Sequence, residues 1–279
     1  MVPRVGPAAV LFDMGGTLEE VALEPAGSGR GETALLAELG GAGVIQRPLA
    51  PGELTARVEE GLNAYKRQMH AEGELRELAP LEIWSRWILA GEGFAPGRLT
   101  AQVAEELSFL YETEGFRRSL RPEARPMLEE LTRRGYPLGV ISNSISLTQV
   151  ARTLRLHRLE ALFGTVQVSA LAGRRKPHPA MFLTAAAELH VEPGRCVYVG
   201  DTFTRDVLGA RAAGYGYALL MRSPLGRETD ARDGGDLEVY AAVEAVWERS
   251  ITSLDEVPGL LAELEVSRKD GVADGYAAS

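Results

Sequence analysis

The amino-acid sequence predicts an α/β protein with a parallel sheet, interrupted near its start by a helical insertion. Short apolar runs that end at polar residues alternate with helical stretches after residue 122, whereas residues 30–115 show helical periodicity alone. A continuous apolar run suits a strand that is covered on both faces. Alternation of such strands with helices is the pattern of a parallel sheet between two helical layers.

The expected elements follow from these patterns and from the glycine and proline residues that break them. Strands are expected at residues 8–12, 137–142, 165–169, 195–199 and 216–221, with helices at 123–134, 146–156, 178–190 and 204–213. Helices of the insertion are expected at 32–39, 52–71, 80–90 and 99–113. Residues 13–29 and 223–237 are expected to be loops, and a last strand and helix are expected within 250–265, before a frayed tail at 266–279.

Composition and charge exclude several classes of protein. The 279 residues carry a formal net charge of −9 and no long basic run, which argues against binding nucleic acid or an anionic membrane. No apolar run approaches the roughly 18 residues of a spanning helix. The N-terminus lacks the pattern of a signal peptide, so we expect a soluble, cytoplasmic protein, either a monomer or a homodimer. The one cysteine, Cys196, lies in an apolar run and is expected to be buried.

The residues with useful chemistry follow the apolar runs or lie in short loops. Ligands of a parallel sheet bind beyond the carboxyl ends of its strands, so these side chains are expected to converge. They are Asp13, Ser142, Asn143, Lys176, Asp201 and Asp206. Carboxylate oxygens are ligands that Mg²⁺ prefers, and a lysine with a hydroxyl group suits the oxygens of a phosphate. Any one aspartate would also suit the cap of a helix, but the whole set at strand ends favours a site.

Four segments resemble the motifs of the haloacid dehalogenase (HAD) superfamily, in the same order. They are FDMGGTL, VISNS, RKPHPAMF and VYVGDTFTRDVLGARAAG. The resemblance covers the first strand and most of residues 115–222. It implies a Rossmann-like core of residues 1–19 and 116–279 with an α-helical cap of residues 20–115, which closes over the site and selects the substrate.

The resemblance also implies roles for individual residues. Asp13 is expected to attack phosphorus and form an aspartyl-phosphate, while Ser142 binds the transferred group and Lys176 steadies the charge. Mg²⁺ is expected on Asp13, Asp201, Asp206 and the backbone carbonyl of Gly15, and substrate contacts are expected from Gly16, Thr17 and Asn143. A small phosphorylated molecule is the expected substrate.

The chain departs from this pattern at Gly15, where the family has a second aspartate that protonates the leaving oxygen. Losing a general acid costs about 10²–10⁴ in rate. We favour a phosphatase-like hydrolase that uses another acid or a leaving group that needs no proton. Candidate substitutes are Glu19, Glu20 and His70.

Two other interpretations stay open. The protein could hydrolyse a phosphonate, with Lys66 of the insertion forming a Schiff base, or a carbon–halogen bond. It could also bind a phosphorylated ligand with weak or no turnover. Arginines flank the return from the insertion to the core; they are Arg117, Arg118, Arg121 and Arg125. Most of them are expected to be solvated, and one could reach an anionic substrate.

Overall fold

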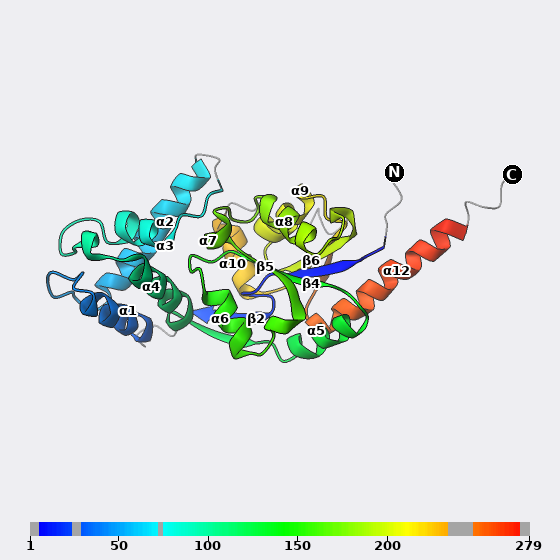
Figure 1. Cartoon of the computed structure of the whole chain (residues 1–279), viewed down its shortest axis with the longest axis horizontal. Coiled ribbons are helices and arrows are strands. Elements are labelled where there is room, and N and C mark those ends of the chain that lie inside the picture. Colours follow the sequence, from blue (N-terminus) through cyan, green and yellow to red (C-terminus); the bar gives the residue numbers. More distant parts are fainter. Residues whose placement is uncertain (1–5, 24–28, 72–74, 234–247, 274–279) are drawn as a thin grey trace.

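A six-stranded parallel sheet forms the centre of the computed structural model, which describes residues 6–23, 29–71, 75–233 and 248–273 (Figure 1). The strand order is β5-β4-β1-β6-β7-β8, and all five pairings are parallel. These strands are β5 (Phe163–Val168), β4 (Leu138–Ser142), β1 (Ala9–Phe12), β6 (Cys196–Gly200), β7 (Tyr217–Met221) and β8 (Glu248–Ile251). The predicted α/β class is confirmed.

Helices cover both faces of this sheet, because successive strand residues point to opposite sides. Val10 and Phe12 pack on one face, against α5 (Ala124–Arg133), α6 (Gln149–Leu156) and α12 (Val257–Ala273). Ala9 and Leu11 pack on the other face, against α8 (Ala180–Glu188) and α9 (Leu208–Ala212). Figure 1 shows α8 and α9 on one side of β1 and β6, with α5 on the other. Short helical turns join these elements; they are η3 (Glu160–Leu162), α7 (Ser169–Ala172), η4 (Pro193–Arg195) and η6 (Leu254–Glu256).

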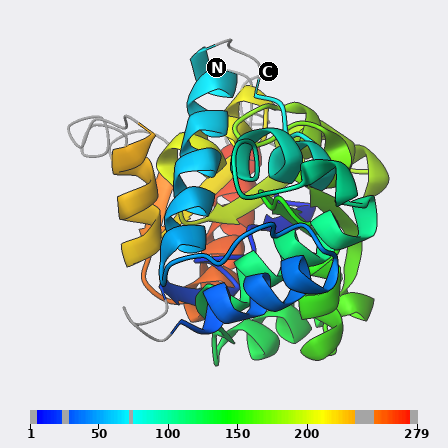
Figure 2. The same ribbon diagram turned by 90° about the vertical axis from the view of Figure 1, so that its left-hand side faces the viewer.

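The insertion is helical in its described part and has its own hydrophobic cluster. Its elements are α1 (Arg30–Gly41), α2 (Glu53–Ala71), α3 (Pro80–Glu82), the π-helix η1 (Ile83–Ile88), η2 (Pro96–Arg98) and α4 (Ala101–Glu114). Trp84, Tyr65 and Leu54 are fully buried within this cluster. Figure 2, a view of the same molecule turned by 90°, places α1, α2 and α4 in front of the sheet. The four predicted helices are therefore present, the third mostly as a π-helix.

A two-stranded ribbon joins the insertion to the sheet. The prediction of a loop at residues 13–29 was therefore wrong at residues 19–23, whereas residues 24–28 lie outside the described part of the chain. β2 (Glu19–Leu23) pairs antiparallel with β3 (Phe116–Leu120), so that Glu19 lies opposite Leu120. Each strand is short and mixed in polarity, and its partner lies about a hundred residues away in sequence. Local patterns of apolar residues do not reveal such a pairing.

Two predictions near the C-terminus were also wrong. Part of the expected loop at 223–237 is α10 (Pro224–Arg232), which has a proline in its first turn and a cap in which the Gly226 amide donates to Ser223 Oγ at 2.8 Å. Serine followed by proline is a signal for a helix start. The tail at 266–279, expected to be frayed, is helical up to Ala273, because α12 spans Val257–Ala273, and residues 274–279 lie outside the described ranges.

Two glutamates of the insertion accept hydrogen bonds from the loop that follows β4. Glu105 of α4 accepts hydrogen bonds from the Leu147 and Thr148 amides, at 2.7 and 3.0 Å. Glu112 of the same helix accepts from the Ile145 amide at 2.9 Å, and burial raises the pKa of this carboxyl. These contacts place the insertion directly over the carboxyl edge of the sheet.

Candidate active site

Three aspartates and a lysine converge at the carboxyl edge of the sheet, as predicted. Asp13 follows β1, Asp201 follows β6, and Asp206 lies on the π-helix η5 (Phe203–Val207). One carboxylate oxygen from each aspartate lies within 4.8 Å of the others. All three residues are buried, so their charges interact with little screening by water.

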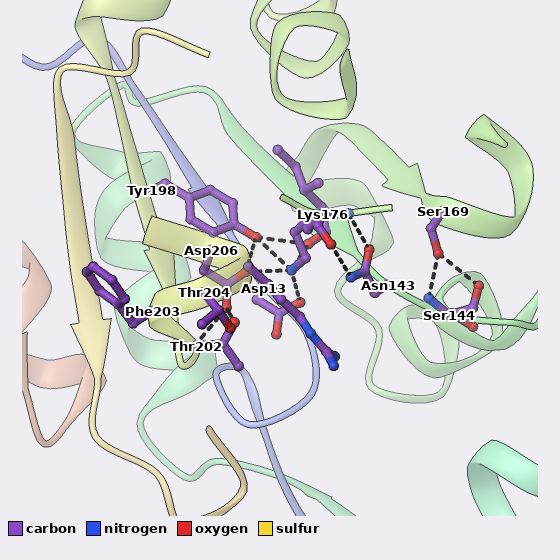
Figure 3. A network of polar contacts seen from close by, with 12 residues as sticks. Asp13, Asn143, Ser144, Ser169, Lys176, Tyr198, Thr202, Phe203, Thr204 and Asp206 are labelled. Carbon is purple, nitrogen blue, oxygen red and sulfur yellow. Dashed lines mark hydrogen bonds and ion pairs between the residues drawn. The ribbon is translucent and has the colours of Figure 1, made fainter. Parts of the chain in front are cut away.

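Lys176, in the loop before α8, is the centre of the network drawn in Figure 3. Its Nζ lies 2.6 Å from Asp13 Oδ1 and 2.7 Å from Asp206 Oδ1. It also donates to the Ile141 carbonyl at 2.9 Å. Burial alone would lower the pKa of Lys176, but the two aspartates outweigh burial and raise it. The ammonium group therefore stays charged beside Asp13.

Tyr198 belongs to this network, although no sequence argument singled it out. Its hydroxyl accepts a hydrogen bond from Lys176 Nζ at 3.0 Å and lies 3.2 Å from Asp206 Oδ1. Strand alternation in CVYVG places this ring on the same face of the sheet as α8. The Tyr198 hydroxyl thus helps to position Lys176. The alternation of residues along this strand is the sequence signal that indicates the position of Tyr198.

The carboxylate of Asp206 is fixed by hydrogen bonds from Thr202 and Lys176. Its Oδ2 accepts hydrogen bonds from the Thr202 amide at 2.9 Å and from the Thr202 hydroxyl at 2.6 Å. Burial would raise the pKa of this carboxyl, but Lys176 and Thr202 outweigh burial and lower it. Asp206 is therefore ionised, and its main contacts orient Lys176 and the start of η5.

Asp13 and Asp201 differ from Asp206 in that their pKa values are raised. Burial raises the pKa of Asp13 to about 6, against the opposing effect of Lys176. Burial also raises the pKa of Asp201 well above its usual value, and the neighbouring charges of Asp13 and Asp206 add to this. Three carboxylates face a single ammonium group, so the donor set suits a divalent cation with hard oxygen ligands. Asp13, Asp201 and Asp206 are the side chains that would hold it.

The loop after Asp13 packs tightly against Asp201. A Cβ atom at Gly16 would lie 2.0 Å from Asp201 Oδ2, and Gly16 has a φ of 89°, so only glycine fits there. Ser223 donates to the same Oδ2 at 2.7 Å, and Arg121 Nη2 donates to the Gly16 carbonyl at 3.2 Å. The carboxylate of Asp201 is thereby fixed next to this loop.

Gly15 faces the ribbon, where an arginine occupies the adjacent space. A Cβ atom at Gly15 would lie 3.2 Å from Arg118 Nη2. Arg118 donates to Glu19 Oε2 from Nε at 3.0 Å and from Nη2 at 2.7 Å. The Glu19 side chain is only 2% exposed, and His157 Nε2 lies 3.9 Å from its other oxygen. An ion pair between a buried glutamate and a partly buried arginine thus lies beside Gly15.

The remaining predicted residues differ in their surroundings. Ser142 is buried at the end of β4, and among the described residues its hydroxyl has no hydrogen-bond partner. Asn143 Nδ2 donates to the Lys176 carbonyl at 3.1 Å, and Asn143 Oδ1 accepts from the Lys176 amide at 2.8 Å, so this side chain positions the lysine loop. Thr17 is fully buried, and its hydroxyl has no partner within the described ranges. Substrate binding by Gly16, Thr17 and Asn143 stays a prediction.

The three substitute acids considered from sequence are not equivalent. Glu19 is buried and paired with Arg118, whereas the Glu20 side chain is 62% exposed and pairs with Arg121 at 3.2 Å. The side chain of His70 lies outside the described part of the chain. Of the two glutamates, only Glu19 lies against the space beside Gly15.

A cavity of about 1140 Å³ opens beside the ribbon. Gly16 and Ser223, which both touch Asp201, form part of its wall. Six arginines and three glutamates line it, so its lining carries a surplus of positive charge. The cavity suits an anionic molecule.

The fold and the site define a class of α/β proteins with an aspartate cluster and a lysine at the carboxyl edge of a parallel sheet. A model of the haloacid dehalogenase-like hydrolase family matches residues 7–214, and the chain belongs to this family. No helix among the described residues is long and apolar enough to span a membrane.

The alignments of this chain with curated relatives cover about half of each relative's length. A glyceraldehyde 3-phosphate phosphatase of Methanopyrus kandleri is 36% identical over 118 residues, which are 42% of this chain and 49% of the relative. A ribulose-1,5-bisphosphate 5-phosphatase of Halopiger xanaduensis is 33% identical over 144 residues, 52% of this chain and 57% of the relative. This chain thus spans about half the length of the curated relatives it matches.

Solved structures support the fold. A 2-haloacid dehalogenase from Pseudomonas syringae has a TM-score of 0.61 and 24% identity, covering 92% of this chain and 99% of that one. A HAD hydrolase of Bacillus subtilis bound to magnesium has a TM-score of 0.55 and 20% identity, covering 92% of this chain and 99% of that one. At these identities the likeness shows the architecture alone.

Proposed function

We propose that this protein is a phosphatase-like hydrolase that acts on a small phosphorylated molecule, with Asp13 as the nucleophile. One observation carries the proposal. The buried carboxylate of Asp13 lies 2.6 Å from the ammonium of Lys176, in a cluster of three aspartates at the sheet edge. A carboxylate in such a site can attack phosphorus and form an aspartyl-phosphate.

The other residues of the site have distinct roles in this proposal. Lys176 neutralises charge on Asp13 and on the phosphate oxygens, and the unpartnered hydroxyl of Ser142 donates a hydrogen bond to the phosphate. Mg²⁺, held by Asp13, Asp201, Asp206 and the Gly15 carbonyl, would offset the negative charge of the phosphate and of the carboxylates. Residues 20–115 form the cap that excludes water and selects the substrate, and residues 1–19 and 116–279 form the core.

The relatives' names support the substrate class. Three of them act on small phosphorylated compounds, namely glyceraldehyde 3-phosphate, ribulose 1,5-bisphosphate and phosphoserine. We propose a cytoplasmic enzyme, monomeric or homodimeric, that binds neither nucleic acid nor membrane. The acidic net charge of −9 agrees with the last two points.

The test is phosphate release from a panel of phosphate esters and acyl phosphates with Mg²⁺. We expect Asp13→Asn to abolish turnover, because the amide is a poor nucleophile. Wild-type protein should also bind beryllium fluoride in the presence of Mg²⁺, as a mimic of the phosphorylated aspartate. Undiminished activity in a clean Asp13→Asn preparation would refute covalent catalysis at this residue.

A second candidate function has one observation in its favour. Lys66 of α2 is partly buried, and burial, followed by the nearby Arg175 and Arg205, lowers its pKa to about 8. An amine with a lowered pKa condenses readily with an aldehyde to give an imine and water. Hydrolysis of a phosphonate through such an imine is tested by borohydride reduction with phosphonoacetaldehyde. A mass adduct on Lys66 supports this function, and its absence excludes it.

A further inference from the structure

The Arg118 side chain lies beside Gly15, the position at which the family has an acidic residue and this chain does not. Its Nη2 lies 3.2 Å from the Cβ position of Gly15, two residues after the proposed nucleophile. Glu19 fixes the guanidinium through two hydrogen bonds, and the Arg118 side chain is only 16% exposed. The charged group beside Gly15 is therefore held in one orientation.

A guanidinium offers charge and hydrogen bonds, but it does not give up a proton at any working pH. Lys176 is already bonded to Asp13, Asp206 and the Ile141 carbonyl, so it is not available on the Gly15 side. Gly15 itself has no side chain. This side of the site can stabilise an anion but has no neutral acid on residues 15 or 118.

We propose that Arg118, held over Gly15 by Glu19, stabilises a leaving group that departs as an oxyanion, so that the site takes phosphates of acidic leaving groups such as acyl phosphates. This inference rests on the proposed function and narrows its substrate class. It makes Arg118 a specificity-determining residue.

The cavity supports this choice independently. Arg118 lies between Gly15 and the cavity of about 1140 Å³, which it helps to line. Four of the six arginines in the lining are paired with glutamates, so the lining keeps an excess of two arginines over these glutamates. A departing carboxylate would therefore enter a positively charged space, whereas a neutral alcohol would gain nothing from that charge.

The step balances without a proton. An oxygen of Asp13 forms a bond to phosphorus while the bond from phosphorus to the leaving oxygen breaks. The electron pair of the broken bond stays on the leaving oxygen, which departs as a carboxylate or phenolate beside Arg118. Water then attacks the aspartyl-phosphate, Asp13 regains its electron pair, and the proton of the water passes to the phosphate or to solvent.

The experiment compares phosphate release from acetyl phosphate, a series of substituted phenyl phosphates and an alkyl phosphate, with Mg²⁺. The key variant is the double change Arg118→Met with Glu19→Gln, which removes both charges and so leaves no buried charge unpaired. We expect kcat/KM to fall by about 10² for the phenyl phosphates, the cost of losing one stabilising donor. The dependence of rate on leaving-group acidity should become steeper. Arg118→Lys, which keeps the charge, should lose less.

The double change Arg249→Met with Glu263→Gln is the matched control, because it also removes an arginine–glutamate pair, but one whose side chains are both 58% exposed and lie outside the cavity lining. We expect its kcat/KM to stay near the wild-type value. If the folded double variant at Arg118 and Glu19 and the Arg118→Lys variant both behave like this control, or if wild-type rates do not depend on leaving-group acidity, the inference is overturned while the proposed function stands. If folded wild-type protein with Mg²⁺ releases phosphate from no compound, the proposed function fails, and this inference with it.

Discussion

The two sides of Asp13 differ in how their charges are arranged. On one side, Lys176 joins Asp13 and Asp206 and is braced by Tyr198 and the Ile141 carbonyl. On the other side, Gly15 carries no side chain, and the Arg118–Glu19 pair of the ribbon fills the adjacent space. The first side is equipped to balance charge around a phosphate. The second side offers the charge of Arg118 but lacks the acid expected at residue 15.

The largest effect on stability and turnover is expected when the Lys176 side chain is replaced. Lys176→Met leaves Asp13 and Asp206 facing each other without compensation in a buried site. Removing one partner of a buried ion pair typically costs about 3–5 kcal/mol, so we expect a loss of this size in the free energy of unfolding, together with loss of turnover. Urea denaturation measures it. Lys66→Met serves as the control lysine, and an equal loss of stability in both variants would contradict the assigned role of Lys176.

The second effect concerns Gly15→Asp, which adds the missing acid. Gly15 does not have a positive φ, and the nearest atom to a new Cβ is the end of the Arg118 side chain at 3.2 Å, so the loop can accept the substitution. We expect hydrolysis of an alkyl phosphate to rise about tenfold, with a smaller rise for a nitrophenyl phosphate, whose leaving group needs no proton. This gain is below the full 10²–10⁴ of a general acid, because Arg118 favours the ionised form of the new carboxyl.

The control for this experiment is Gly15→Ala, which adds bulk without an acid. A folded Gly15→Asp protein that binds Mg²⁺ and gains no more than Gly15→Ala would show that the missing acid does not limit the site. Adding Arg118→Met and Glu19→Gln to Gly15→Asp should increase the gain for the alkyl phosphate. These comparisons separate proton donation from charge at the same position.

The Lys176 side and the Arg118 side of Asp13 also differ in how much of each could be predicted from the sequence. Asp13 and Asp201 end apolar runs, so their convergence follows from the geometry of a parallel sheet, and Lys176 and Asp206 lie in short segments beside them. Arg118 reaches Gly15 only because β2 and β3 pair across about a hundred residues, and each strand is too short and too polar to be recognised by itself. The sequence marked an arginine cluster at this hinge but not which arginine turns inward. The docking glutamate Glu105 was missed because its partners lie in a distant loop, whereas strand alternation was an available signal for Tyr198.

A smaller change, in the affinity for Mg²⁺, is expected when an aspartate that binds the cation is replaced. Within the described ranges the Asp201 carboxylate accepts one hydrogen bond, from Ser223 Oγ to Oδ2, whereas both oxygens of Asp206 accept hydrogen bonds from Lys176 or Thr202. We therefore expect Asp201→Asn to weaken Mg²⁺ binding by at least about tenfold, the loss of a charged ligand. Calorimetry on both proteins measures it. Equal affinity of wild type and variant would remove Asp201 from the metal site.

The smallest effect is expected in the metal-free protein, where the same substitution should be stabilising. The pKa of Asp201 is raised in the folded state, mainly by burial and then by Asp13 and Asp206. For an acid with a raised folded pKa, the stability it contributes is present below its unfolded value near 3.8 and is lost as the pH rises toward the folded value. Asparagine resembles the uncharged acid at every pH, so its advantage should be small near pH 4 and larger at neutral pH.

We expect Asp201→Asn to raise the stability of the metal-free protein by about 1 kcal/mol at pH 7.5, which is roughly 2–4 °C in Tm for a chain of this size. Thermal unfolding in EDTA measures this gain, and Mg²⁺ should reverse the order, since only the wild type gains from the cation. The exposed Asp255→Asn should change neither value. A metal-free Asp201→Asn protein that is less stable than wild type at pH 7.5 would show that Ser223 and Lys176 already balance this carboxylate. The excess negative charge that argues for a cation on this side of Asp13 would then be absent.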